Sequence, residues 1–171
     1  MRGAPRASTA SSIVRGERRG HSPRVRSLVV NTPHVALFED ASRGIVWLIR
    51  RPTEGAVSAE IVDCYRRCLE AADARHARMG LVVDVRNTVL REDRVFEQGM
   101  KLVRARATRS FARVAVLVAT PRGARKAHQV RQEDESADFV TYDPVEAERW
   151  AAGEYVRTPR DEGALAPDER E

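Results

Sequence analysis

Apolar residues fill nearly every position of the stretch from Arg113 to Thr120. In an extended chain they would lie on both faces, with Val114, Val116 and Val118 on one face and Ala115, Leu117 and Ala119 on the other. This pattern is typical of a strand that is covered on both sides in a parallel sheet. We therefore expect this stretch to form a central strand around which the rest of the chain folds.

A second buried strand is predicted at residues 81–86, where the sequence is Leu-Val-Val-Asp-Val-Arg. Between the two strands, Asp93 can cap a helix that runs to about Ser110. Apolar residues would line the inner face of this helix, namely Phe96, Met100, Val103 and Ala107. Two parallel strands joined by a helix form a right-handed crossover, so the sequence predicts a βαβ unit.

The chain before this unit predicts a hairpin and a further helix. Residues 34–39 and 44–50 have the composition of two strands, and the turn between them contains aspartate and serine. Pro52 would end the second strand, and Thr53 would cap a helix that continues to about Arg78. The buried stripe of this helix would consist of Val57, Ile61, Tyr65, Cys68, Leu69 and Ala72.

Two shorter elements are expected after the central strand. Pro121 and Gly123 interrupt the strand pattern, and residues 124–135 favour a weakly amphipathic helix. Residues 139–142 then predict a short last strand.

The final helix has strong boundary signals. Asp143 is followed by proline at the first helical position and by Glu146 at the third, which is the pattern of a capping box. Gly153 would end the helix. We expect Trp150 on this helix and Trp47 on the hairpin to pack in the core. The alternative is that a tryptophan on an edge strand contacts a partner protein.

Together these elements follow the order β-β-α-β-α-β-α-β-α. This order predicts an α/β fold with a mostly parallel five-stranded sheet and an N-terminal antiparallel hairpin. The domain should span residues 34–156, between a disordered basic tail at residues 1–33 and a disordered tail at residues 157–171. Within the first tail, Leu28–Val30 is an apolar segment that could lie against the domain.

The net charge of +5 comes from the N-terminal tail. Residues 1–33 hold seven arginines and one glutamate, whereas residues 34–156 hold 20 basic and 19 acidic residues. Because the domain itself is nearly neutral, its charge argues against a nucleic-acid-binding face.

Cysteine and histidine form no metal-site signature. Cys64 and Cys68 are the two cysteines of the chain and lie on a predicted helix, so both should point into the core as reduced thiols. The four histidines are dispersed, and none is spaced with a cysteine as zinc ligands are. We therefore expect no metal and no cofactor.

The apolar runs are strand-sized, far shorter than the roughly 18 residues of a membrane span. The first residues also lack the continuous apolar region of a secretory signal. The sequence thus predicts a cytoplasmic protein with no transmembrane segment.

The element order and three segments resemble bacterial proteins of the SpoIIAA-like, STAS-type superfamily. The segments are Leu81–Asn87, Arg113–Val118 and the closing Tyr142–Trp150, and the likeness covers roughly residues 34–153. The resemblance implies a small non-enzymatic module that acts by protein contact, as in anti-sigma-factor antagonists that bind a kinase partner. Those proteins carry a phosphorylatable serine after an aspartate at the start of the helix that follows the third strand. Here Arg94 follows Asp93, which argues against a phosphorylation switch.

Polar residues gather at the carboxyl end of the 81–86 strand, where open parallel sheets collect ligands. The candidates for partner binding are Asp84, Arg86, Asn87, Thr88, Arg91 and Asp93. The competing interpretation is structural, with one aspartate bound to a neighbouring amide, the asparagine in a turn and the other aspartate at a helix cap. No nucleophile elbow and no nucleophile close to a histidine is present in the sequence, so catalysis here is the weaker alternative.

Basic residues cover the predicted helix before the central strand. Lys101, Arg104 and Arg109 are candidates for binding an anion or a membrane surface, and a solvated helix face is the alternative. The stretch Gly123–Lys126 also follows a strand, but it lacks the glycine spacing and the hydroxyl residue of a phosphate-binding loop.

Successive right-handed crossovers place their helices on one face of a sheet, yet the predicted strands are apolar on both faces. The other face therefore needs a cover, which could be a further helix, the Leu28–Val30 segment, an apolar ligand or a second copy of the chain. We expect a homodimer or an apolar-ligand groove on that face.

Three functional hypotheses follow. The first is a non-catalytic regulatory or binding module that contacts an unidentified protein partner. The second is an anion- or lipid-binding protein that uses the arginine-rich helix and the sheet face. The third is an enzyme whose site is the loop after Asp84.

Overall fold

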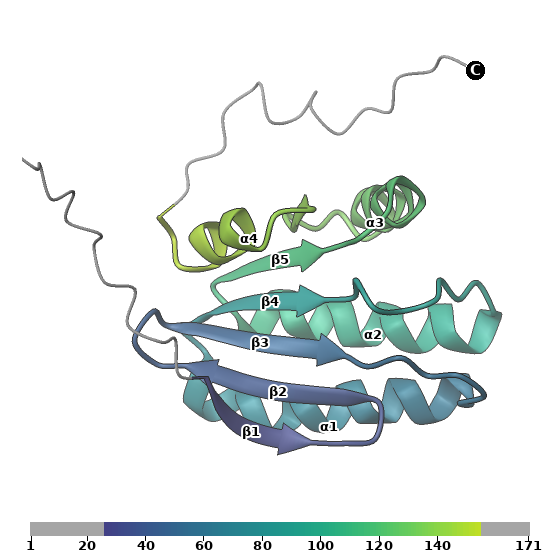
Figure 1. The fold of residues 1–171 in the computed structure, drawn as a ribbon, viewed down its shortest axis with the longest axis horizontal. Coiled ribbons are helices and arrows are strands. Elements are labelled where there is room, and N and C mark those ends of the chain that lie inside the picture. Colours follow the sequence, from purple (N-terminus) through teal and green to yellow (C-terminus); the bar gives the residue numbers. More distant parts are fainter. Residues whose placement is uncertain (1–25, 155–171) are drawn as a thin grey trace, which may run out of the picture.

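The computed structural model describes residues 26–154, and the predictions for residues 1–25 and 155–171 lie outside this range. Six strands and four helices follow one another along the described chain (Figure 1). The strands are β1 (Ser27–Asn31), β2 (Val35–Asp40), β3 (Ile45–Arg50), β4 (Gly80–Asp84), β5 (Arg113–Leu117) and β6 (Phe139–Thr141). The helices are α1 (Ser58–His76), α2 (Arg94–Ser110), α3 (Pro121–Glu133) and α4 (Pro144–Ala151).

The strands form one sheet in sequential order, β1-β2-β3-β4-β5-β6. β1, β2 and β3 pair antiparallel, and β3 to β6 pair parallel. The α/β class and the 35–50 hairpin agree with the sequence, but the sheet has six strands where five were predicted, and three of them form the antiparallel part. β5, predicted as the central strand, is covered on both faces but lies next to the last strand, while β3 and β4 occupy the centre.

The additional strand, β1, lies within the segment that was predicted to be a disordered tail. It pairs with β2 and has an irregular register between Leu28 and Val30. Arg51 fastens the turn that follows, because its guanidinium donates to the Thr32 carbonyl at 3.0 Å and to the Asn31 side chain at 2.5 Å. The Leu28–Val30 segment therefore extends the sheet at its edge instead of covering a face.

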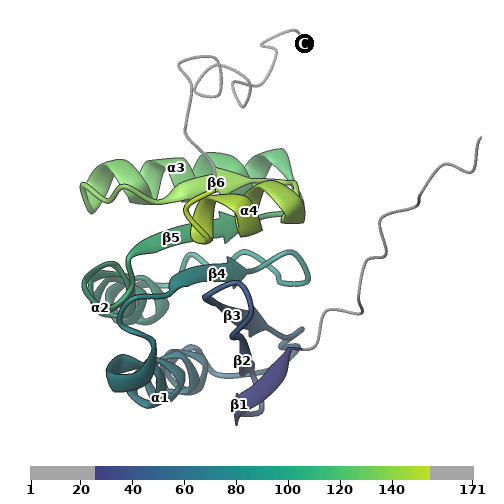
Figure 2. The same ribbon diagram turned by 90° about the vertical axis from the view of Figure 1, so that its left-hand side faces the viewer.

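Helices α1, α2 and α3 lie on the same face of the sheet, as the crossover rule predicts (Figure 2). The apolar stripes of α1 and α2 pack on β2 to β5 and form the larger core. Gly99 lets the two helices approach closely, because a Cβ at this position would lie 2.6 Å from Val62 Cγ1. At the end of α1, His76 is fully buried and its Nε2 lies 3.5 Å from Glu39 Oε2 on β2.

Helix α4 covers the opposite face over β4, β5 and β6 (Figure 2). It forms a second core with Trp47 and Phe139, and the Trp150 ring stacks on Phe139 at 5.1 Å between centroids. Trp150 Nε1 also donates to the Val114 carbonyl at 3.2 Å. Both tryptophans therefore pack in the core, as predicted. The sequence did not indicate what covers this face of the sheet, and the structure shows that the final helix does. We predicted a homodimer or a ligand groove because this face of the sheet lacked a cover. Over β4, β5 and β6, helix α4 provides that cover, so the reason for the prediction does not apply there.

The helix boundaries confirm most capping predictions. Asp93 caps α2 by accepting from the Phe96 amide at 2.9 Å, and Asp143 caps α4 by accepting from the Val145 amide at 2.7 Å. The predicted capping box at α4 is incomplete, since Glu146 accepts instead from the Thr141 hydroxyl at 2.7 Å.

Two helices begin elsewhere than predicted. The start of α1 at Thr53 was wrong, because Gly55 has φ of 74° and the helix begins only at Ser58. α3 begins at Pro121, three residues before the prediction, with Thr120 as its cap. Within residues 26–154, no helix is both long enough and apolar enough to cross a membrane.

Candidate ligand-binding cavity

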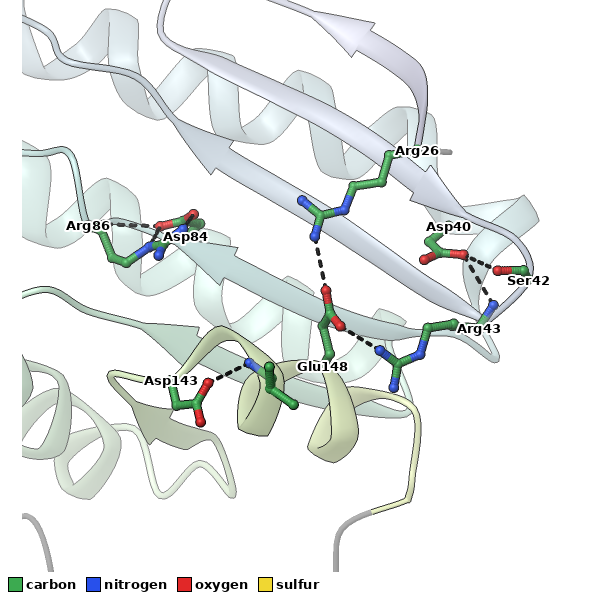
Figure 3. A network of polar contacts seen from close by, with 9 residues as sticks. Arg26, Asp40, Ser42, Arg43, Asp84, Arg86, Asp143 and Glu148 are labelled. Carbon is green, nitrogen blue, oxygen red and sulfur yellow. Dashed lines mark hydrogen bonds and ion pairs between the residues drawn. The ribbon is translucent and has the colours of Figure 1, made fainter. Parts of the chain in front are cut away.

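Asp84 and Arg86, two of the predicted site residues, bind each other. Asp84 is 5% exposed, and its two carboxylate oxygens accept from Arg86 Nε at 3.0 Å and Nη2 at 2.8 Å (Figure 3). The Arg86 backbone amide also donates to the same carboxylate at 3.1 Å. The hydrogen bond with Asp84 raises the pKa of the Arg86 guanidinium above its ordinary value. This pair closes the end of β4 and leaves little of the carboxylate for a ligand.

Arg91 and Asp93 hold the start of α1. Asp93 accepts from the Ser58 hydroxyl at 2.6 Å, and Arg91 donates to the same hydroxyl at 3.1 Å and to the Ala56 carbonyl at 2.7 Å. The Ser58 hydrogen bond, with the Phe96 amide, holds the pKa of Asp93 below its ordinary value. These contacts support the structural interpretation of both residues.

The remaining two loop candidates do not join this cluster. Thr88 donates its hydroxyl to the Val85 carbonyl at 2.7 Å, which forms a local turn. Asn87 is exposed on the surface of the loop. The six predicted residues therefore lie along the end of β4 and the following loop without converging on a common point.

The basic candidates on α2 do not form an anion site together. Arg104 Nε binds Asp134 at 2.6 Å at the end of α3, and Arg109 Nε donates to the Ala105 carbonyl of its own helix at 3.0 Å. Lys101 is exposed. Lys126, in the stretch considered as a phosphate loop, lies in α3 and pairs with Glu97 at 3.1 Å.

The structure instead shows a cavity of about 250 Å³ on the face that carries α1, α2 and α3. Its floor is the inner face of β4, β5 and β6, and its walls are α2 and α3. The lining is mostly apolar and includes Val83, Val85, Met100, Val103, Ala107, Val114, Val116, Val118, Ala127, Val130 and Val140. Two ion pairs already described, Arg104–Asp134 and Lys126–Glu97, connect the two walls.

Arg50 lines one end of this cavity. It is the last residue of β3 and points to the same face as Val46 and Leu48, and the residue is only 5% exposed. Its Nε and Nη2 are buried and have no hydrogen-bond partner among the described residues. The guanidinium lies over the Phe96 ring, with Cζ 5.1 Å from the ring centroid.

Tyr65 and Arg91 complete the polar end of the cavity. Tyr65 lies close to Arg50, and burial raises the pKa of the Tyr65 hydroxyl because it is desolvated there. Burial also lowers the pKa of the Arg50 guanidinium, and the nearby charge of Arg91 acts in the same direction. This end of the cavity therefore holds excess positive charge.

Asp138, which precedes β6, also lines the cavity. It is 8% exposed, and desolvation by burial raises the pKa of its carboxyl above the ordinary value. Its side chain lies at the α3 side, away from the strand that carries Arg50, since β3 and β6 are separated by two strands.

Sequence reasoning missed Arg50, although a signal was present. The alternation through Val46 and Leu48 places residue 50 on the inward face, and an arginine at such a position is rarely buried without a partner. Asp138 had no comparable signal, because it lies in a connection without periodicity.

Within the described residues, no group of three or more histidine, cysteine or acidic side chains could hold a metal ion. Cys64 and Cys68 are free and buried. Both lie in the core under α1, and neither lines the cavity.

Comparison of this chain with protein-family models, with curated proteins and with solved structures found no match. The resemblance to the STAS-type superfamily therefore depends on the predicted element order and the three sequence segments alone.

Proposed function

We propose that this protein is a non-catalytic binding protein whose ligand is a small, largely apolar molecule held in the cavity between the sheet and helices α2 and α3. The observation that carries the proposal is the cavity itself. It is a space of about 250 Å³ that is partly open to solvent and lined mostly by apolar side chains with a few polar groups, as small-molecule sites usually are.

The volume indicates the size of the ligand. Cavities of roughly 150 Å³ accept a benzene molecule, and pockets for drug-sized ligands begin at about 300 Å³. A space of about 250 Å³ lies between these limits. The ligand would therefore be larger than one ring and smaller than a typical drug.

The lining supports binding without turnover. Neither a histidine nor a cysteine lines the cavity, and of its two acidic residues Glu97 is paired with Lys126 while Asp138 lies at the α3 side, away from Arg50. The acidic residues of the predicted loop, Asp84 and Asp93, are held by hydrogen bonds from their own neighbourhood. This arrangement favours recognition over acid–base chemistry.

A protein contact at the loop after β4 is our second proposal. The observation that favours it is the exposure of Val89, which is 77% exposed beside the exposed Arg86 and Asn87. Residues 85–91 also include several that line the cavity, so a bound ligand would contact the segment that faces the partner. Hydrogen exchange of this segment should then slow when a ligand binds, and unchanged exchange would contradict the link.

The cavity can be tested with the full-length protein and the neutral dye N-phenyl-1-naphthylamine, whose fluorescence rises in apolar surroundings. We expect saturable enhancement with the wild-type protein. In the variant Ala127→Phe, a phenyl ring on α3 would fill the cavity, so the enhancement should fall at least tenfold.

The matched control is Ala105→Phe, which adds the same ring at an exposed helical position outside the cavity and should leave dye binding unchanged. Thermal melts of both variants would show that they fold. A wild-type protein that leaves the dye emission unchanged would contradict the proposal, as would a folded Ala127→Phe protein that binds the dye normally.

A further inference from the structure

We propose that the ligand of this cavity is an amphipathic carboxylic acid whose carboxylate binds the guanidinium of Arg50 while its apolar chain occupies the space between α2, α3 and the sheet. This inference rests on the proposed function, because it assigns the head group of a ligand in the same cavity.

The first argument is the state of Arg50. An arginine remains charged in proteins, and a buried charge without a partner is costly. Nε and Nη2 of Arg50 are shielded from solvent, so water does not replace the missing acceptors. Tyr65 lies beside Arg50 but supplies no negative charge, since burial raises the pKa of its hydroxyl. The site therefore lacks an anion.

The second argument is the identity of the two free atoms. Nε and Nη2 form one edge of the guanidinium, with two parallel N–H groups that match the two oxygens of a carboxylate. Arg86 in the same protein uses this edge to bind Asp84, at 3.0 Å and 2.8 Å. The unpartnered atoms of Arg50 are thus the same two atoms with which Arg86 binds the Asp84 carboxylate.

The third argument is the charge around this end of the cavity. Arg91 also lines this end of the cavity. Its N–H groups donate to the Ser58 hydroxyl and to two backbone carbonyls, all of which are uncharged. Among the described residues, no carboxylate lies within ion-pair distance of Arg50, and Arg91 has only an electrostatic interaction with Asp93, which shares its Ser58 hydroxyl. A monoanion at this end would be attracted by both guanidinium groups.

The contact of Arg50 with Phe96 is the competing explanation for its burial. A cation over an aromatic ring is stabilised, and the distance of 5.1 Å lies within the usual range. That contact places the charge near an aromatic ring, but it gives the Nε and Nη2 hydrogens no hydrogen-bond acceptor. Because these atoms are covered, the head group must displace a neighbouring side chain as it enters, and Phe96, which lines the cavity, is the one we expect to move.

The apolar lining determines the rest of the ligand. Valine side chains from β4, β5 and β6 and apolar residues of α2 and α3 offer no buried hydrogen-bond donor that would hold a second polar group along the floor. A medium-length alkyl chain fits a space of about 250 Å³ with this lining. Octanoate is therefore a suitable probe, and octanamide has the same chain and an uncharged head group.

The test measures displacement of N-phenyl-1-naphthylamine from the full-length protein by each probe. We expect octanoate to bind at least tenfold more tightly than octanamide, because charge-assisted hydrogen bonds are the stronger class. Equal displacement by the two probes would overturn the carboxylate assignment while leaving the apolar cavity in place. A protein that binds neither the dye nor the probes would contradict the proposed function itself.

The variant Arg50→Met keeps an unbranched side chain of similar reach and removes the charge. We expect it to lose at least tenfold in octanoate affinity relative to its octanamide affinity, so that the preference for the carboxylate disappears. The control is Arg51→Met, which removes the adjacent arginine, whose donors go to Asn31 and Thr32 outside the cavity. Undiminished octanoate binding by Arg50→Met would overturn the proposal. If that variant does not fold, the comparison of octanoate with octanamide on the wild-type protein decides.

Discussion

Glu148 on α4 accepts a hydrogen bond from Arg43 Nη1 at 2.5 Å, although the two residues are 105 positions apart in the chain (Figure 3). The Glu148 side chain is 3% exposed, and its other oxygen accepts from Arg26 at 3.0 Å. Arg26 in turn stacks on the Trp47 ring, with Cζ 3.7 Å from the centroid. One carboxylate therefore joins the last helix to the turn between β2 and β3 and to the chain just before β1.

Glu148→Ala should lower the free energy of unfolding by about 2 kcal/mol, measured by urea denaturation. Removing one partner of a fully buried pair costs roughly 3–5 kcal/mol, and the loss here is smaller because both arginines can turn toward water. Their side chains are 19% and 30% exposed. Glu154→Ala is the control, because Glu154 also binds Arg43 but is 55% exposed, and its loss should be below about 1 kcal/mol. Equal losses would show that burial does not distinguish the two contacts.

Gly80→Ala tests the packing of α4 on the sheet. A Cβ on Gly80 would overlap the backbone carbonyl of Ala151, so the helix would have to move. We expect a loss of about 2–4 kcal/mol, at the upper end of overpacking effects. In the control Gly123→Ala, the new Cβ lies 3.3 Å from Oγ1 of Thr120, the residue that caps α3, and the gain in helix propensity should keep the change below about 1 kcal/mol. A Gly80→Ala protein as stable as the wild type would mean that α4 is not held in this position.

Asp138→Asn should stabilise the protein at neutral pH and have a smaller effect in acid. Burial raises the pKa of Asp138 in the folded state above its ordinary value of 3.8, so the ionised carboxylate destabilises the fold at pH 7. As the pH falls through the folded-state pKa, the wild-type residue takes up its proton and this penalty disappears. Thermal melts of both proteins between pH 7 and pH 4 would measure the difference. A stabilisation that grows toward low pH would contradict the assignment.

Cys64 and Cys68 should resist alkylation while the protein is folded. Burial raises the pKa of the Cys68 thiol to about 11, so only about one thiol in a thousand would be ionised at pH 8. Mass spectrometry after iodoacetamide treatment should find no modification in buffer and two modifications in urea. Rapid labelling of the native protein would show that α1 opens readily.

Local patterns predicted most elements and the side of the sheet on which the crossover helices lie. The alternation of Val114 to Ala119 predicted a strand covered on both faces, and the spacing of Phe96, Val103 and Ala107 predicted the inner face of α2. Both patterns are local, because burial on a fixed face repeats every two residues in a strand and about every 3.6 in a helix. The caps at Asp93 and Asp143 were also readable, since a cap involves only the next few residues.

The β1 strand and the start of α1 were not predicted. β1 has three apolar residues within a basic, serine-containing segment, and it becomes a strand because β2 offers a free edge. The sequence pattern of α1 extends back to Thr53. Gly55, however, has a left-handed backbone conformation that separates Thr53 from the helix. In both cases the outcome depends on neighbours or backbone geometry that periodicity does not describe.

The sequence by itself determined the α/β class, the order of most elements and the inward or outward direction of their side chains, because these follow from local periodicity and short-range capping. Only the tertiary structure decided which polar groups meet. It paired Asp84 with Arg86 and Glu148 with Arg43, and it left Arg50 in a cavity wall without an anion. The physical reason is that such pairs depend on the relative placement of elements far apart in the chain, where small shifts in packing decide whether a charge finds a partner.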